Sequence, residues 1–400
     1  MATQNGAITL DAVGAINFSP DAGLYAGSGA ITLTGSQVTA GILSGNGGIA
    51  VQSRSGDLML GGVMQTGGAV QLTSPTHLTV AQPIGVTGSG SLNLNAGLDL
   101  SVDALLLASE DASLTLTAGR DLRLDAALVS DQGDLTLSAE GSVISSAQAG
   151  LYSTAGAVRV KAVQTLNAPT VMTAGVIDLS SQSGSLRLLG QIRGGSAPVG
   201  MTAAGDIAVD QSIVLGNGGS LNLEAGRALV VNAIVEGGSG VDFNLSAGGD
   251  VTLNRDLVAQ SGGIDVNAGG AMHFAADSGV YAGSGSIRLN AGSGNMTPGY
   301  LQAGGGAALD SGGSLNIVRA IGSDVGSLTL TADGNLAINA PIAHVGRGLI
   351  AHAGGDLSVN SQLDGIGGFL GLSAGNNVYV NADIASANAP LTVNAGGTLV

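Results

Sequence analysis

The sequence contains no cysteine and no tryptophan, and lysine occurs only once, at Lys161. The lack of cysteine excludes a disulfide scaffold, a thiol nucleophile and a zinc–thiolate site. Apolar runs are short, since the longest, such as Leu105–Leu107, span only a few residues, whereas a transmembrane helix needs about 18 or more. We therefore expect no membrane insertion.

Charged residues are also scarce, and most of them are acidic. The 12 Lys and Arg residues against 28 Asp and Glu residues give a formal net charge of −16. We therefore expect no nucleic-acid partner, because nucleic acid attracts basic proteins. Intrinsic disorder is excluded as well, because disordered chains are rich in charge and poor in apolar residues, and this chain is 44% hydrophobic. No charged segment followed by an apolar segment comes after Met1, so a secretory signal lies elsewhere or the chain is a piece of a longer protein.

Glycine, by contrast, is abundant, with 69 of 400 residues, and it accompanies a repeat. Short apolar–x–apolar segments recur at a mean spacing of roughly 21 residues, which is within the range of solenoid repeats. About 19 such segments begin at Ile8, Ile31, Ile49, Val70, Leu92, Leu114, Leu135, Val158, Ile177, Val199, Leu221, Phe243, Ile264, Ile287, Ala307, Leu328, Leu349, Leu370 and Leu391.

The repeat unit is clearest between Leu114 and Leu128. Apolar residues alternate over 114–118 and again over 122–126, which is the pattern of two short β-strands that each bury one face. Gly119-Arg-Asp121 interrupts the alternation and predicts a corner, and Leu128 lies on a third short strand. Glycine suits such corners because it adopts positive φ without strain.

The repeats are themselves grouped, since the spacings between them recur after every sixth one. They predict three super-repeats of six coils, 8–134, 135–263 and 264–390, with residues 391–400 beginning a fourth, truncated copy. Residue identity agrees, because the segment Gly23–Ile31 is matched by 150–158 and 279–287. We expect residues 1–400 to be a single continuous domain cut from a longer array.

Three strands and three corners per repeat predict an all-β fold, a right-handed parallel β-helix (solenoid) of about 19 coils. A single coil cannot fold alone, because ordering 21 or so residues costs more than burying about six apolar side chains returns, so neighbouring coils must stabilise one another. A β-propeller is excluded, because each of its blades needs about 40 residues per repeat, and the spacing here is roughly 21. A left-handed hexapeptide helix would show a strict six-residue apolar step, which is absent.

The corners carry a degenerate motif of alanine, glycine and aspartate followed by a strand, seen at 118–124, 247–253 and 353–359. In these residues the array resembles the repeats of filamentous haemagglutinin-like exoproteins, the large adhesins of two-partner secretion. The resemblance covers nearly the whole chain, and its specificity comes from recurrence. It implies a secreted, β-helical protein that is adhesive or bears a toxin.

No candidate catalytic, cofactor-binding or metal-binding residue emerges from the sequence. One corner position carries an aspartate in several coils, but mostly in coils that are not adjacent, so we expect these carboxylates to hydrogen-bond their own backbone rather than to cooperate in acid–base chemistry. The four histidines lack the spacing and acidic neighbours of a metal site. The aspartates and histidines are Asp57, Asp121, Asp206, Asp250, Asp356, His77, His273, His344 and His352.

Two sets of residues recur at equivalent places. Asn339, Asn360 and Asn381 end the second strand of successive coils, and we interpret them as a structural amide ladder, with a ligand site as the alternative. Tyr25, Tyr152 and Tyr281 stand in the first coil of each super-repeat. Packing beneath a wide corner is the favoured interpretation for these tyrosines, and a surface contact with sugar or with a neighbouring filament is the alternative. Asn232 and Asn254 form an earlier pair of the same kind.

The main functional hypothesis is a non-enzymatic structural shaft of a secreted bacterial surface protein, which projects a terminal binding or toxin domain. The second is a binding module whose long face contacts host or bacterial surface glycans or proteins, and a polysaccharide-degrading enzyme is the third. Self-association, end to end or laterally, is a further expectation. An ice-binding face is rejected, because the outward positions mix Thr32, Ala50 and Gln71 instead of repeating threonine.

Overall fold

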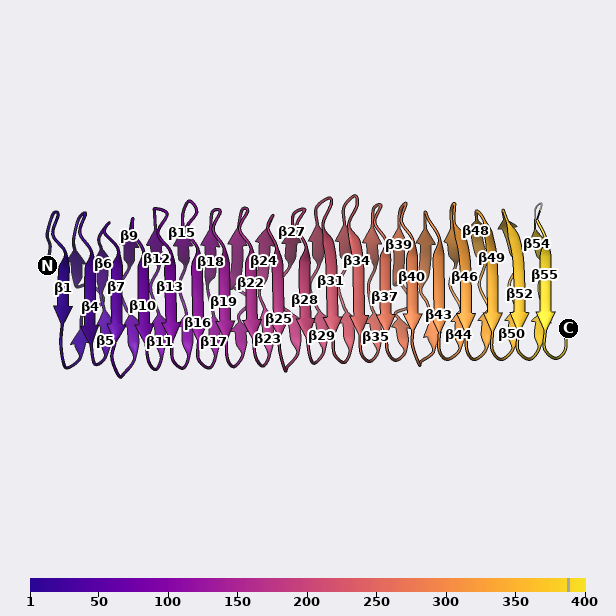
Figure 1. The fold of residues 1–400 in the computed structure, drawn as a ribbon, viewed down its shortest axis with the longest axis horizontal. Coiled ribbons are helices and arrows are strands. Elements are labelled where there is room, and N and C mark those ends of the chain that lie inside the picture. Colours follow the sequence, from indigo (N-terminus) through magenta and orange to yellow (C-terminus); the bar gives the residue numbers. More distant parts are fainter. Residues whose placement is uncertain (387–388) are drawn as a thin grey trace. The chain divides into compact units, whose positions relative to one another are not determined.

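The computed structural model describes residues 1–386 and 389–400, and within them all regular secondary structure is β-strand. The chain divides into two compact units, Met1–Ala203 and Ala204–Val400. In both units every three successive strands form one coil, and each strand pairs in parallel with its counterpart in the next coil. The strands that face the viewer in Figure 1 run downwards, and the chain returns upwards behind them as the coils advance from the N-terminal end, so the winding is right-handed.

This arrangement confirms the all-β, parallel β-helix with three short strands per coil. Along the described chain there are about 18 turns, close to the 19 that the repeat spacing predicts. The apolar starts predicted from the sequence coincide with the first strand of each coil or lie one residue inside it, as at Leu114 in β16 (Leu114–Ala118) and Leu221 in β31 (Ser220–Ala225). Each unit contains three parallel sheets, here called the first, second and third sheet after the order of their strands within a coil.

In the unit Met1–Ala203, the first sheet contains β1 (Ile8–Asp11), β4 (Ile31–Gly35), β7 (Ile49–Ser53), β10 (Val70–Ser74), β13 (Leu92–Ala96), β16, β19 (Leu135–Ala139), β22 (Val158–Ala162), β25 (Ile177–Ser181) and β28 (Val199–Ala203). The second sheet contains β2 (Ile16–Asn17), β5 (Val38–Ala40), β8 (Leu58–Leu60), β11 (Leu78–Val80), β14 (Leu100–Val102), β17 (Leu122–Leu124), β20 (Val143–Ser145), β23 (Leu166–Ala168) and β26 (Leu186–Leu188). The third sheet contains β3 (Gly23–Tyr25), β6 (Ile42–Ser44), β9 (Met64–Thr66), β12 (Ile84–Val86), β15 (Leu106–Ala108), β18 (Ala127–Ser130), β21 (Gly150–Ser153), β24 (Thr170–Thr173) and β27 (Ile192–Gly194).

In the unit Ala204–Val400, the first sheet contains β31, β34 (Asp242–Ala247), β37 (Ile264–Ala268), β40 (Ile287–Ala291), β43 (Ala307–Ser311), β46 (Ser327–Ala332), β49 (Gly348–Ala353), β52 (Phe369–Ala374) and β55 (Leu391–Ala395). The second sheet contains β29 (Ile207–Val209), β32 (Leu229–Val231), β35 (Val251–Leu253), β38 (Met272–Phe274), β41 (Met296–Thr297), β44 (Leu315–Ile317), β47 (Leu336–Ile338), β50 (Leu357–Val359) and β53 (Val378–Val380). The third sheet contains β30 (Ile213–Leu215), β33 (Val235–Gly237), β36 (Leu257–Ala259), β39 (Gly279–Ala282), β42 (Tyr300–Ala303), β45 (Ile321–Ser323), β48 (Ile342–Val345), β51 (Leu363–Ile366) and β54 (Ile384–Ser386).

The core of each unit is the inside of the coils, and the alternation along each strand fills it. In β16, Leu114, Leu116 and Ala118 are fully buried, while Thr115 and Thr117 face outwards. The strand register places similar side chains at equivalent positions of successive coils. Leu116, for example, lies between its counterparts Leu94 and Leu137 in the neighbouring coils. Each inward leucine is therefore in contact with the same kind of side chain above and below it, which buries a continuous apolar column.

The last inward residue of the first strand is small, usually alanine or serine, and it is Gly35 in β4. Where serine occurs, its buried hydroxyl donates a hydrogen bond to a carbonyl oxygen at the adjoining corner. Ser74 Oγ lies 3.0 Å from the carbonyl oxygen of Gly56, and Ser311 Oγ lies 2.9 Å from that of Gly294. These bonds satisfy the hydroxyl group and a corner carbonyl together, so the polar atoms are paired inside the apolar core.

At many corners, including the one at Gly119, glycine is required by close approach and not by positive φ. Among the described residues, positive φ is confined to a few glycines and Glu110, and Gly119 is not one of them. A Cβ atom added to Gly119 would lie 2.1 Å from the carbonyl oxygen of Gly97, its counterpart one coil earlier. Corner backbones of successive coils touch here, so only a residue without a side chain fits. The expected conformational reason for this glycine was wrong, although its position was right.

Candidate functional site

The corner aspartates bind the backbone of the next coil, not their own. Asp121 Oδ1 accepts a hydrogen bond from the amide nitrogen of Ser142 at 2.8 Å, and Asp250 Oδ1 accepts one from Ala271 at 2.8 Å. In each pair the donor occupies the same corner position one coil later. Asparagine does the same, since Asn335 Oδ1 accepts from the amide of Asp356 at 2.9 Å. The expectation of a local backbone bond was therefore wrong.

These bonds follow a simple rule. The acceptor is an aspartate or asparagine that immediately precedes the first inward residue of a strand. Its side-chain oxygen accepts a hydrogen bond from the backbone N–H of the residue at the equivalent position in the next coil. The rule holds at corners before second strands and also before first and third strands. Further examples are Asp57 to His77, Asp99 to Asp121, Asp206 to Ala228, Asn295 to Ser314, Asp356 to Asn377, Asn377 to Thr398, Asp134 to Ala157, Asp242 to Gly263 and Asp256 to Gly279.

One corner also carries a small ionic cluster. The Arg120 guanidinium donates two hydrogen bonds to the carboxylate of Asp99, and His77 Nδ1 lies 3.2 Å from Asp99 Oδ2. The hydrogen bond from Arg120 holds the pKa of Asp99 below its usual value, and the backbone bond from Asp121 acts in the same direction. Two coils before Asp99, the hydrogen bond from the Thr76 hydroxyl lowers the pKa of Asp57.

Replacing Asp99 should separate the two roles of a corner carboxylate. Asp99→Asn keeps an oxygen that accepts from the Asp121 amide and loses the charge facing Arg120 and His77. Asp99→Ala loses the acceptor oxygen as well as the charge. A carboxyl with a lowered folded pKa stabilises the protein above its unfolded pKa of about 4, and this contribution is lost as the pH falls through the folded value. We expect wild type to melt above Asp99→Asn at pH 7, and the difference to shrink and then vanish as the pH falls below about 4 and through the lowered folded pKa of Asp99.

The alanine variant is the control for the charge effect. Asp99→Ala should remain less stable than Asp99→Asn at every pH, because the Asp121 amide then lacks its acceptor, a loss of roughly 1 kcal/mol. Thermal melts followed by circular dichroism between pH 2.5 and 7 measure both differences. Equal melting temperatures of the two variants across this range would contradict the capping role.

The predicted asparagine residues lie in one chain of hydrogen bonds. Asn360 Nδ2 donates to Asn339 Oδ1 at 2.7 Å, and Asn381 Nδ2 donates to Asn360 Oδ1 at 2.7 Å. The chain extends backwards, because Asn339 Nδ2 donates to Asn316 Oδ1 at 2.7 Å. Asn339, Asn360 and Asn381 are exposed, and the carboxamides of Asn339 and Asn360 each donate to one neighbouring coil and accept from the other. The earlier pair is linked in the same way, with Asn254 donating to Asn232 at 2.7 Å.

Tyr25, Tyr152 and Tyr281 lie on the outer face of the third sheet and not beneath a corner. Each follows a glycine by two residues and covers it, since a Cβ atom on Gly150 would lie 2.4 Å from the ring of Tyr152. Tyr25 is 44% exposed, and the other two are partly exposed. Burial raises the pKa of Tyr281, with the charge of Asp256 adding to the effect. The favoured interpretation is thus replaced by packing of each ring on its own strand, with one edge accessible.

The outer face of the first sheet carries no charged residue from β4 to β19. Its outward positions are Thr32, Thr34, Ala50, Gln52, Gln71, Thr73, Asn93, Asn95, Thr115, Thr117, Thr136 and Ser138. Asp11 on β1 and Arg159 with Lys161 on β22 are the nearest charges along this face. In a chain with a net charge of −16, a face of six strands without charge is a distinct surface.

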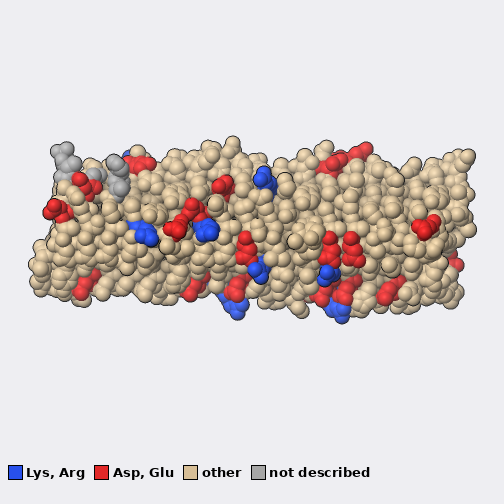
Figure 2. Space-filling view, turned by 180° about the vertical axis from the view of Figure 1, so that it is seen from behind, with Lys and Arg blue, Asp and Glu red and all other residues tan. Residues whose placement is uncertain are grey.

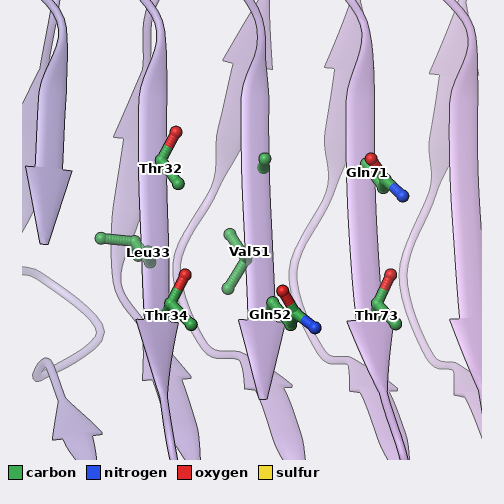
Figure 3. Close-up of a pocket in the computed structure, with 8 residues that line it drawn as sticks. Thr32, Leu33, Thr34, Val51, Gln52, Gln71 and Thr73 are labelled. Atoms are coloured by element: carbon green, nitrogen blue, oxygen red, sulfur yellow. The ribbon is translucent and has the colours of Figure 1, made fainter. Parts of the chain in front are cut away.

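The uncharged face has a shallow depression at Ala50, because the side chain of Ala50 is shorter than the outward side chains around it. Hydroxyl and amide groups of Thr32, Thr34, Gln52 and Gln71 surround it, as Figure 3 shows. Leu33 and Val51 extend to the other side of the sheet, into the core. The sequence interpretation treated these positions only as evidence against an ice-binding face. The useful signal was the absence of charge at every outward position over six coils.

Charges elsewhere are dispersed. Figure 2 shows the side turned away from the first sheet, where acidic and basic groups occur singly or in small groups of opposite sign on a mostly uncharged surface. Within residues 1–386 and 389–400 no group of three or more His, Cys, Asp or Glu side chains could hold a metal ion. His273 and His352 are exposed, and the His344 side chain lies outside the described residues.

Comparison with protein-family models, with characterised proteins and with solved structures found no match to this chain. No helix in the described part of the chain is long and apolar enough to span a membrane. The function therefore has to be argued from the surfaces and the hydrogen-bonded corners described above.

Proposed function

We propose that this chain is a non-enzymatic structural shaft of a secreted bacterial surface adhesin or filamentous exoprotein. Its role is to hold a terminal binding or toxin domain at a distance from the cell surface. The corner motif and its resemblance to filamentous haemagglutinin-like repeats support the assignment to this class and to the cell surface.

The observation that carries the proposal is the redundancy of the bonds between successive coils. The backbone ladders of three sheets, the capped corners and the amide ladder all connect one coil to the next. A protein that binds or transforms a small molecule needs such additional bonds only around one site. In this chain, bonds between successive coils recur along the stack. Uniform reinforcement along the stacking direction suits a spacer that has to resist bending.

The alternative is that the β-helix itself binds a surface glycan or another filament. The uncharged face from β4 to β19 favours this function, because its hydroxyl and carboxamide groups offer donors and acceptors without the repulsion that the acidic remainder of the chain exerts. Shaft and binding face are compatible, since they use different properties of the same coils.

Distances between spin labels test the shaft. The chain has no cysteine, so paired cysteines introduced at outward-facing positions label uniquely. Thr32 and Thr329 occupy the same outward position of β4 and β46, 14 coils apart in chain order. At about 4.8 Å per coil, a continuous stiff stack gives roughly 67 Å between them. We expect double electron–electron resonance to show one narrow distribution near this value.

A pair within one unit calibrates the measurement. Thr32 and Thr136 occupy the same position of β4 and β19, five coils apart, and should give about 24 Å. If this pair gives a narrow distribution and the long pair a broad or much shorter one, the units move independently and the shaft proposal fails.

A further inference from the structure

Aromatic residues gather at one place in the second unit. The whole chain has only 4 phenylalanines and 5 tyrosines. Phe274, Tyr281 and Tyr300, three of these nine, lie in two successive coils around the corner between the second and third sheets. Arg319, in the next coil, places its guanidinium carbon 5.7 Å from the centre of the Tyr300 ring. We call Phe274, Tyr281, Tyr300 and Arg319 the aromatic corner.

The members of the aromatic corner are held in place by the coils beneath them. Arg319 Nε donates a hydrogen bond to the carbonyl oxygen of Ala276 at 3.2 Å, across two coils. Tyr300 pairs in register with Gly279, and the Tyr281 ring covers Gly279, since a Cβ atom there would lie 2.5 Å from the Tyr281 hydroxyl. A depression beside these groups is lined by residues that include Phe274, Pro298 and Arg319. The tyrosines do not line it, and Tyr300 borders it through its contact with Arg319. Tyr300 is 42% exposed at its edge.

These large side chains are not a constant part of the repeat. The second super-repeat has small or polar residues at the equivalent strand positions. The residues equivalent to Phe274, Tyr300 and Arg319 are Ser145, Thr170 and Gly190. Tyr300 is exposed, and Phe274 and Arg319 are partly exposed. Large side chains at the surface that the second super-repeat replaces by smaller ones cost solubility, so a ligand is a better explanation than packing.

We propose that the aromatic corner binds a neutral pyranose-containing glycan. Apolar ring surface from Phe274 and Pro298 suits the C–H face of a sugar, while Arg319 and the tyrosine hydroxyl groups can bond to its hydroxyls. The charge argues for a neutral ligand, since Asp277 lies in the same corner as Ala276 and Asp256 acts on Tyr281. These carboxylates offset Arg319 and oppose an acidic sugar. This inference goes beyond the proposed shaft and does not depend on it.

Titration with defined sugars tests the site. The probes are neutral hexasaccharides of glucose, galactose and N-acetylglucosamine, with a sulfated hexasaccharide as the acidic comparison. Because the protein lacks tryptophan, its tyrosine fluorescence is directly observable. We expect at least one neutral probe to change this fluorescence saturably and to bind in calorimetry with a Kd below about 1 mM. The acidic probe should bind more weakly.

Variants that introduce residues of the second super-repeat are designed to remove the site, and we expect them to fold. Tyr300→Thr and Arg319→Gly should each weaken the binding of that probe about fivefold or more, and the double variant should abolish it. Tyr379→Ser is the matched control, since it removes a partly exposed tyrosine outside the aromatic corner whose counterpart one coil earlier is Ser358. Circular dichroism should show unchanged melting for all of them.

Several results would overturn the proposal. They are the absence of binding of every neutral probe at roughly 10 mM, tighter binding of the sulfated probe, or an affinity that Tyr300→Thr and Arg319→Gly leave unchanged. The label distances between Thr32 and Thr329 are independent of this outcome, so failure of the shaft and failure of the glycan site are distinguishable.

Discussion

Leu116→Asp should unfold the first unit around its coil. Leu116 is fully buried between Leu94 and Leu137, and a carboxylate there has no partner among the apolar columns. Loss of the leucine packing together with an unpaired buried charge costs about 5 kcal/mol or more. Because each coil supports its neighbours, we expect the damage to spread beyond one turn and to lower the melting temperature by more than about 10 °C.

The neighbouring residue provides the matched control. Thr115 lies on the same strand and faces outwards, between Asn93 and Thr136 on the uncharged face. Thr115→Asp should shift melting by no more than about 2 °C, because its carboxylate stays in water. Thermal melts of the two variants, followed by far-ultraviolet circular dichroism, measure the contrast. Similar losses in both variants would mean that the burial pattern is wrong.

Removal of one complete coil should leave a folded protein. Deletion of residues 92–113 takes out β13, β14 and β15 and joins Ser91 to Leu114, so that β16 can take the place of β13 on β10. The apolar columns and the parallel register continue across the junction, since Leu114 occupies the position of Leu92. We expect a cooperative melt within about 5 °C of wild type, because only one nearest-neighbour interface is replaced by an equivalent one.

Removal of a fraction of a coil should instead destroy the fold locally. Deletion of residues 92–102 removes β13 and β14 and leaves β15 where a first strand belongs, so two sheets lose a member and the corners no longer coincide. We expect loss of the cooperative transition for this unit and susceptibility to limited proteolysis near the junction. A melt as sharp and as high as that of the whole-coil deletion would show that coil phase does not govern stability.

The positions of the strands could be predicted from the sequence because the signal is local. Alternation over three residues, as at Leu114, Leu116 and Ala118, decides which side chains face inwards, and every coil repeats the same decision. Coil stacking then follows, since a single coil is unstable alone. The outward polar positions followed from the same alternation.

The corners and the aromatic corner depended on the tertiary structure. The sequence indicated that aspartate belongs at a corner. The hydrogen-bond donor to Asp121 is the amide nitrogen of Ser142, and this bond depends on the distance between successive coils. The approach of Gly119 to the backbone of Gly97 likewise depends on coil spacing. Phe274, Tyr300 and Arg319 come together only because the register places residues about one coil apart side by side. Local alternation thus determined which residues lie inside, whereas the register between coils decided which surface groups meet.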